Sequence, residues 1–222
     1  MHGTLATRSG IGLSVSVAVM PTKHERAQTT AATLSRGPVL AVSLALVVVL
    51  TVLFKVWGSL VTDDSLGIIR SQLAFTSSRF SDVIGTWNIA EFIRLTATLD
   101  FVYPIAYGAA IAGTWARAIG PGHWPGTAWP LLAAGGAAAA DWVENTFHLI
   151  AIEPTITGES PIALAVAIGS VFAAIKWIGI IAGLTAITRA AWKRGGWRWL
   201  PIGALCAGGA GAIAGVVFST AV

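Results

Sequence analysis

Five long apolar stretches constrain this 222-residue chain more than any other feature of its sequence. A helix needs about 20 residues to cross the roughly 30 Å hydrocarbon core of a bilayer, because it rises about 1.5 Å per residue. We place the five spans at residues 38–60, 95–117, 128–151, 161–188 and 199–221. Since backbone groups in lipid must be hydrogen-bonded internally, the sequence predicts an all-α integral membrane bundle of five transmembrane helices.

The composition excludes a soluble core of any size. Hydrophobic residues make up 55% of the chain and charged residues 11%, whereas an ordinary soluble domain is about 25% charged. We therefore expect a disordered cytoplasmic tail over residues 1–37 and a single membrane domain over residues 38–222. The first span is almost entirely aliphatic, so we expect it to be a peripheral anchor that faces lipid on much of its surface.

The basic residues indicate orientation, and they do not indicate a nucleic-acid site. Nine of the 14 Lys and Arg residues lie on one predicted side of the membrane. These nine are Arg8, Lys23, Arg26, Arg36, Arg117, Arg189, Lys193, Arg194 and Arg198. Because positive loops stay cytoplasmic, we predict a cell (inner) membrane protein with its N-terminus in the cytoplasm and its C-terminus outside. Anionic membrane lipids are then the expected partners of the basic loops.

The long loop at residues 62–94 carries an amphipathic pattern. Thr76 can cap a helix whose apolar positions follow the i, i+3, i+4, i+7 spacing. Those positions are Phe80, Val83, Ile84 and Trp87. We predict an interfacial helix in the first outer loop, lying in the headgroup region with its apolar face down. The alternative is a loop helix that packs on the bundle.

Small residues recur every four positions in the last two predicted spans. They are Gly179 and Gly183 in the fourth span, and Gly203, Ala207, Gly211 and Gly215 in the fifth. This spacing lets helix backbones approach one another closely. We expect it to pack the protein's own bundle, and a homo-oligomer formed through the fifth span is the alternative.

Four ionisable side chains interrupt the predicted spans: Asp100, Asp141, Glu144 and Lys176. A charge at bilayer depth is costly unless it is paired, hydrated or neutralised, so such residues indicate a functional site by default. Helical spacing gathers other polar groups beside them. We predict a ligand-binding or proton-relay site between spans two, three and four, formed by Asp100, Tyr103, Tyr107, Asp141, Glu144, Asn145, His148 and Lys176.

Within this site we expect Asp141 and Lys176 to pair, because each would otherwise be an isolated ion in hydrocarbon. Glu144 and Asp100 are then left without a second cation. One or both should hold a proton, or bind a metal or a cationic ligand. The alternative is a purely structural polar network that fixes helix register.

Metal, cofactor and catalytic signatures are weak in this sequence. Glu144 and His148 have the i, i+4 spacing of helical metal ligands, but the full His-Glu-x-x-His pattern is absent, so we expect no metal and no cofactor. No Gly-x-Ser-x-Gly, P-loop or Cys-x-x-Cys motif occurs either, and no catalytic residue can be assigned. Trp142 and Trp177 stand next to the charges, where they either wall a ligand site or pack.

Together these features predict a multi-pass membrane protein with a polar, protonatable intramembrane site open to the outer side. We expect the site to bind or transport a small or lipid-like ligand. Two alternatives stay open. One is an intramembrane enzyme acting on a lipid or isoprenoid-like substrate, with Glu144 or Asp100 as general acid or base. The other is a structural or assembly subunit.

The polar motifs resemble those of a loosely defined bacterial family of small multi-pass membrane proteins. They are Asp-x-x-Tyr-Pro-x-x-Tyr from Asp100 to Tyr107, Asp-x-x-Glu-Asn from Asp141 to Asn145, and Lys176-Trp177. With the stretch from Phe75 to Trp87, the resemblance covers roughly residues 70–190. It implies a helical bundle and supplies no reaction. A more distant analogy is to small four-span sterol isomerase-like and sterol-binding proteins, whose motifs do not match this sequence residue by residue.

Overall fold

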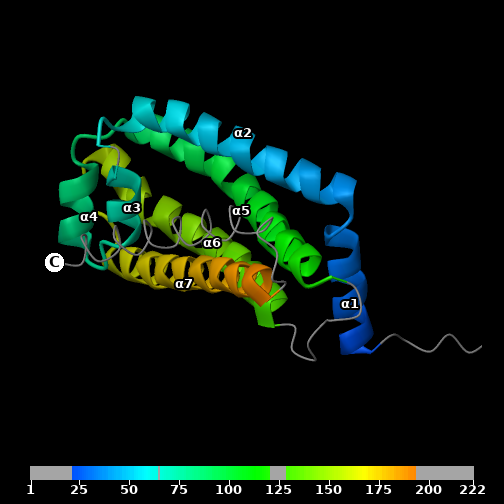
Figure 1. Ribbon diagram of the computed structural model, residues 1–222. Helices are drawn as coiled ribbons and strands as arrows, with labels where there is room; N and C mark the ends of the chain where they lie inside the picture. The colour runs from blue at the N-terminus through cyan, green and yellow to red at the C-terminus, as the bar shows by residue number, and fades with distance from the viewer. Residues whose placement is uncertain (1–21, 65, 121–128, 194–222) are drawn as a thin grey trace, which may run out of the picture.

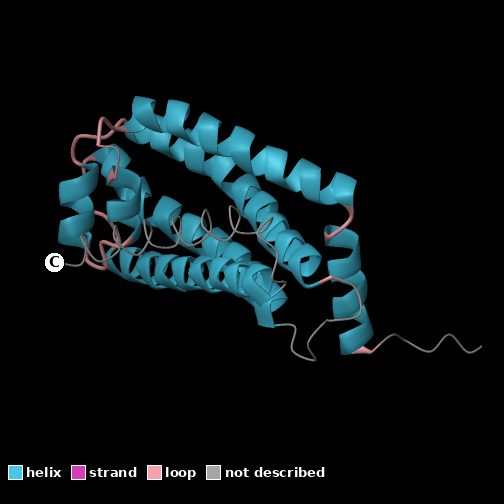
Figure 2. Ribbon diagram, in the orientation of Figure 1, coloured by secondary structure: helices cyan, strands magenta, loops and turns pink. Residues whose placement is uncertain are grey.

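The structure is a computed structural model that describes residues 22–64, 66–120 and 129–193. The regular elements in these ranges are all helices, joined by short loops (Figure 2). They are α1 (Lys23–Leu34), α2 (Gly37–Val61), α3 (Gly67–Gln72), α4 (Ser77–Ile84), α5 (Ile89–Ile119), α6 (Trp129–Ile152), the 3-10 helix η1 (Glu153–Thr157) and α7 (Ala163–Lys193). The predicted all-α class is therefore confirmed for the described residues.

Four long helices lie along one another and form the body of the molecule (Figure 1). Helix α6 packs most extensively on α7 and also contacts α5, while α2 packs on α5. The short helices α3 and α4 lie at one end of this body and contact α7. Helix α1 lies at the opposite end against α5. Helix α1 and the pair α3 and α4 thus lie at opposite ends of the four long helices.

Within the described residues, three helices, α2, α5 and α7, are long and apolar enough to cross a membrane. The prediction of five transmembrane helices is not confirmed. Helix α6 covers the predicted third span with 24 residues, but its polar residues lower its hydropathy, and it is not one of the three. The predicted fifth span at 199–221, with Gly203, Ala207, Gly211 and Gly215, lies outside the described residues.

The prediction of a disordered tail over residues 1–37 is wrong for Lys23–Leu34, which form α1. A capping box starts this helix. The Thr22 hydroxyl accepts from the Glu25 backbone N–H at 3.2 Å, and the Glu25 carboxylate accepts from the Thr22 N–H at 2.6 Å. Two backbone donors of the first turn are thereby satisfied, and Ala31 is fully buried on the bundle.

The amphipathic helix of the loop exists as α4, and Thr76 caps it as predicted by accepting from the Arg79 N–H at 3.4 Å. Its apolar residues Phe80 and Ile84 are buried within a cluster that includes Ile152 and Val166. The apolar face therefore packs on the bundle, as in the alternative weighed above. Its position in the headgroup region stays a prediction.

Gly179 and Gly183 of α7 lie at close contacts with the neighbouring helices α6 and α5, as their spacing predicts. A methyl group added at Gly179 would lie 2.9 Å from the Ala137 Cβ of α6, and one added at Gly183 would lie 2.6 Å from a methyl of Ile111 in α5. Both distances are shorter than real carbon contacts, so α7 can sit this close only with glycine at these positions. The α6–α7 contact is where the buried charges lie.

Candidate functional site

A lysine at the centre of α7 organises the buried charges. Lys176 Nζ donates to Asp141 Oδ1 of α6 at 3.1 Å, as predicted. The same nitrogen lies 2.6 Å from Glu144 Oε2. Lys176, Asp141 and Glu144 are all at most 4% exposed, so water screens these attractions little.

The expectation that Glu144 has no cation partner is therefore wrong. Asp141 and Glu144 are separated by three positions on one helix, which places both carboxylates on the same face. One lysine from the facing helix reaches both. Pairing in this way offsets part of the cost of removing three ions from water.

Asp100 of α5 stands apart from this ion pair network. Among the described residues its carboxylate forms no ion pair, although the side chain is in the same buried region. Asn145 of α6 donates to the Asp100 backbone carbonyl at 2.9 Å, and its amide also faces the carboxylate. Asp100 therefore has a neutral hydrogen-bond donor beside it and no ion pair with a described side chain.

The two tyrosines of α5 connect the network to its surroundings. The Tyr107 hydroxyl lies 3.0 Å from both Asp141 Oδ2 and the Ala137 carbonyl oxygen. The Tyr103 hydroxyl instead lies 3.0 Å from the Thr51 hydroxyl of α2. Tyr107 thus belongs to the charged side of the site, and Tyr103 belongs to the α2 side.

His148 forms the far end of the polar stripe on α6. Its Nδ1 is 3.7 Å from Glu144 Oε1, and its ring stacks on Phe80 of α4 with the ring centroids 5.6 Å apart. A methyl group at Gly169 would meet the imidazole at 2.8 Å. Nε2 has no hydrogen-bond partner within the described ranges. The ring is held by packing, and it lies outside the cavity described next.

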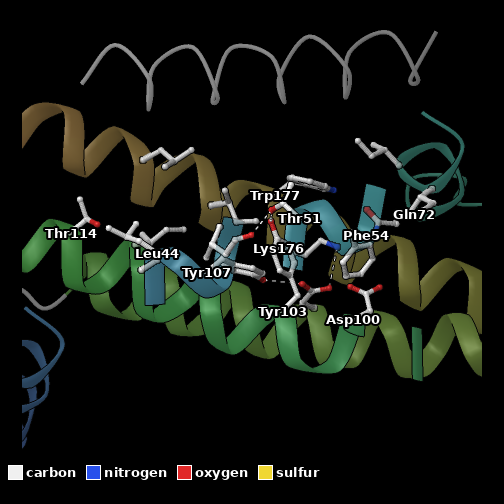
Figure 3. Close-up of a pocket in the computed structure, with 18 of the residues that line it drawn as sticks. Leu44, Thr51, Phe54, Gln72, Asp100, Tyr103, Tyr107, Thr114, Lys176 and Trp177 are labelled. Atoms are coloured by element: carbon white, nitrogen blue, oxygen red, sulfur yellow. Dashed lines mark hydrogen bonds and ion pairs between the residues drawn. The ribbon is translucent and has the colours of Figure 1, made fainter. Parts of the chain in front are cut away.

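A cavity of about 620 Å³ lies among α2, α5, α6 and α7, with α3 at one end (Figure 3). Its lining includes five residues of the predicted site: Asp100, Tyr103, Tyr107, Asp141 and Lys176. Glu144, Asn145 and His148 do not line it. The predicted set therefore divides into cavity-facing groups and groups buried behind them in the contact between α6 and its neighbours.

Most of the remaining wall is apolar. Leu44 and Val47 of α2 face Ile180, Leu184 and Ile187 of α7 across the cavity. Trp177 also lines it, as one of the two alternatives for this residue foresees. Trp142 does not line it and is 42% exposed, with its indole N–H donating to the Phe101 carbonyl. The cavity is thus an apolar chamber with a charged region on its α5–α6–α7 wall.

Sequence reasoning missed the contributions of α2 and α3. Thr51 and Phe54 line the cavity from α2, and Gln72 lines it from α3. The prediction of an anchor that faces lipid on much of its surface did not foresee that one face of α2 lines the cavity. The signal was present: Thr51 is a polar residue in an aliphatic run, and positions 44, 47, 51 and 54 repeat with helical spacing.

The charged groups lie at a similar depth along their helices. Asp100 is 11 residues from the start of α5, Asp141 is 11 from the end of α6, and Lys176 is 13 from the start of α7. At about 1.5 Å per residue these positions are roughly 16–20 Å from the end that carries α3 and α4. Within the described residues, no group of three or more His, Cys, Asp or Glu side chains is placed to hold a metal ion.

Comparison with known proteins does not add a family to this geometry. No protein-family model matches the chain, no curated protein matches it, and no solved structure matches its fold.

Proposed function

We propose that this chain is a membrane protein that binds a small or lipid-like ligand in the cavity between α2, α5 and α7. The observation that carries the proposal is an apolar chamber of about 620 Å³ with charged side chains on one wall. Ligand sites are concavities of about 300–1,000 Å³ that are mostly apolar and have a few converging polar groups. The cavity matches that description in volume and in lining.

Buried charge next to this chamber supports a binding role over a purely structural one. A network that only fixes register needs its charges paired with one another, as Asp141, Glu144 and Lys176 are. Asp100 has no such partner among the described side chains, and it faces the chamber. An intramembrane acid that faces a cavity is typical of substrate and proton pathways.

The charged groups of the site lie roughly 16–20 Å from the end that carries α3 and α4. Ile68, Ile69 and Gln72 of α3 form part of the chamber wall. Together with the distribution of basic residues in the sequence, this supports a site open to the outer side, in a cell membrane protein with its N-terminus in the cytoplasm. Reporter fusions after residues 156 and 64 test this orientation, and a cytoplasmic signal at either position contradicts it.

A tryptophan scan of α2 tests the binding role. Val47→Trp places an indole in the chamber, because Val47 lines it. Val49→Trp is the matched control, since Val49 is 53% exposed and is not part of the lining. We expect a lipid or small molecule to co-purify with the wild-type protein and with Val49→Trp, and to be depleted in Val47→Trp. Equal recovery from all three proteins, measured by mass spectrometry of solvent extracts, would refute the proposal.

An intramembrane enzyme is the second candidate function, and one feature favours it. Tyr107 and Lys176 both contact Asp141 on the chamber wall, an arrangement in which protons can move between a ligand and buried groups. Glu144 is a poor candidate for general acid, because it is fully buried and does not line the chamber. Lipid profiling of a strain that lacks the protein decides between the two. An accumulating precursor supports an enzyme, and an unchanged lipid profile supports binding.

A further inference from the structure

The chemistry of the chamber's polar end selects a class of ligand, and this inference rests on the proposed binding function. Among the described residues, three carboxylates (Asp100, Asp141 and Glu144) share this buried region with one ammonium group, that of Lys176. When all are ionised, the region carries an excess of two negative charges. Even with His148 protonated, one further positive charge is needed for balance.

The excess is located at Asp100. Lys176 is held by Asp141 and Glu144 at 3.1 and 2.6 Å, and among the described residues it forms no ion pair with Asp100. The Asp100 side chain reaches the chamber beside that pair (Figure 3). A buried carboxylate without a cation is costly. A positively charged group in the chamber would lower that cost.

A second group at the chamber points to the same kind of ligand. Gln72 of α3 is 8% exposed and lines the chamber, and its Oε1 has no hydrogen-bond partner within the described residues. A buried acceptor without a donor destabilises the protein, because it has lost its hydrogen bonds to water and gained none in return. Asp100 and Gln72 Oε1 are both acceptors, so the matching ligand group carries N–H or O–H donors. A phosphodiester or carboxylate group offers none at neutral pH.

Aromatic rings complete this end of the chamber. Phe54 and Tyr103 have ring centroids 5.4 Å apart, and Tyr103 and Tyr107 have centroids 5.5 Å apart. All three rings line the chamber together with Asp100. The faces of aromatic rings attract cations, and this attraction strengthens when water is excluded.

From these observations we infer that the ligand is an amphiphile with a protonated amine head group. The ammonium group binds Asp100 among the aromatic rings, and Gln72 Oε1 accepts a second proton of the head group. The apolar chain runs along the wall formed by Val47, Ile111, Leu184 and Ile187. Lys176 stays paired with its two carboxylates and does not contact the head group.

Three probes with the same twelve-carbon chain test the inference at pH 7: dodecylamine, dodecan-1-ol and dodecanoate. Apparent dissociation constants are measured by native mass spectrometry of the full chain released from micelles. We expect dodecylamine to bind at least about tenfold more tightly than the other two, as one charge-assisted hydrogen bond provides. Asp100→Asn should abolish this preference. Asp82→Asn, the same change at an exposed residue of α4, should leave it intact.

Gln72→Leu is a second variant, which keeps the inference testable if Asp100→Asn does not fold. We expect Gln72→Leu to fold, because the Oε1 atom that it removes has no hydrogen-bond partner among the described residues. It should weaken dodecylamine binding severalfold and leave dodecan-1-ol binding unchanged.

The outcomes separate this inference from the proposed function. If the three probes bind equally and Val47→Trp blocks them all, the chamber binds amphiphiles and the amine inference is wrong. A preference for dodecanoate also overturns it, since Lys176 would then select an anion. If no probe binds more tightly to the wild type than to Val47→Trp, both the inference and the proposed function fail.

Discussion

The two long helix contacts on either side of the chamber are built in different ways. In the α6–α7 contact, three ions meet within 3.1 Å, and glycine is required where α7 approaches Ala137. In the α2–α5 contact beside the chamber, the polar groups that meet are neutral, with the Thr51 and Tyr103 hydroxyls 3.0 Å apart. Nearer the end of α2, Trp57 donates to Glu91 at 2.9 Å.

This difference indicates which side of the chamber is fixed. Paired buried ions lose much of their attraction when the helices separate, so charge and close packing together hold α6 and α7 in one register. Helix α2 presents many exposed apolar residues, including Val42, Val48 and Val56. Among the described residues, no buried ion pair joins it to another helix. We expect the α6–α7 contact to be the rigid wall and α2 to be the wall that adjusts to a ligand.

The largest test of this contrast removes the central cation. Lys176→Met leaves Asp141 and Glu144 as buried carboxylates without a partner, and breaking a buried pair in this way costs about 3–5 kcal/mol. Thermal unfolding in detergent measures the loss. Lys55→Met, at an exposed position of α2, is the control and should change little.

Removing the two carboxylate charges from the Lys176→Met variant, one after the other, should recover its stability in steps. Adding Asp141→Asn to Lys176→Met should recover part of the loss, and adding Glu144→Gln as well should recover most of it. The coupling energy between positions 141 and 176 should exceed about 1 kcal/mol, as expected for residues in contact. Additive losses would mean that the three charges do not act as one network.

The second test deletes the same atom on each side of the chamber. Tyr107→Phe removes a hydroxyl that bonds the Asp141 carboxylate, and a hydrogen bond to a charged group contributes about 1.5–3 kcal/mol. Tyr103→Phe removes a hydroxyl that meets only a neutral group, and should cost about 0.5–1.5 kcal/mol. Equal losses of thermal stability in the two variants would remove the distinction between the contacts.

The third test concerns close packing rather than charge. A methyl at Gly179 would lie 2.9 Å from Ala137 Cβ and 3.0 Å from the Ala133 carbonyl oxygen, so Gly179→Ala should destabilise the bundle by about 1–3 kcal/mol. Gly136→Ala is the matched control in α6, where nothing lies within 4 Å of the added methyl. It should be neutral or stabilising by up to about 1 kcal/mol, because alanine favours helix over glycine. A stable Gly179→Ala variant would show that the α6–α7 contact can relax.

Local spacing predicted the residues of the site better than it predicted their partners. The i, i+3, i+4, i+7 pattern placed Asp141, Glu144, Asn145 and His148 on one buried face of α6, as the structure has them. It could not show that one lysine reaches two carboxylates, because that depends on the distance between α6 and α7. Glycine at position 179 sets that distance.

The chamber itself could not be predicted from the sequence. It exists because α2 contacts α5 and leaves a space in front of α7, and this is a property of how helices pack rather than of any one helix. For the same reason Gln72 was missed, since it follows Arg70 and Ser71 in the short helix α3, whose position over the chamber depends on the packing of the long helices. The five-span prediction also counted α6 as a membrane-spanning helix. Because α6 carries a stripe of polar residues, which is buried on its neighbours, the mean hydropathy of its most apolar stretch is lower than in α2, α5 and α7.

The smallest expected effect lies in the α2–α5 contact, and it tests whether α2 is the adjustable wall. Thr51→Val keeps the shape of the side chain and removes the hydroxyl that meets Tyr103. Because the Thr51 hydroxyl also bonds the Val47 carbonyl of its own helix, we expect a loss of no more than about 1 kcal/mol. The double variant with Tyr103→Phe should show a coupling energy well below that of positions 141 and 176. Both energies come from the same thermal unfolding measurements. A coupling between Thr51 and Tyr103 as large as that of the charged pair would mean that α2 is held as firmly as α7, and a ligand would then have to enter without movement of that helix.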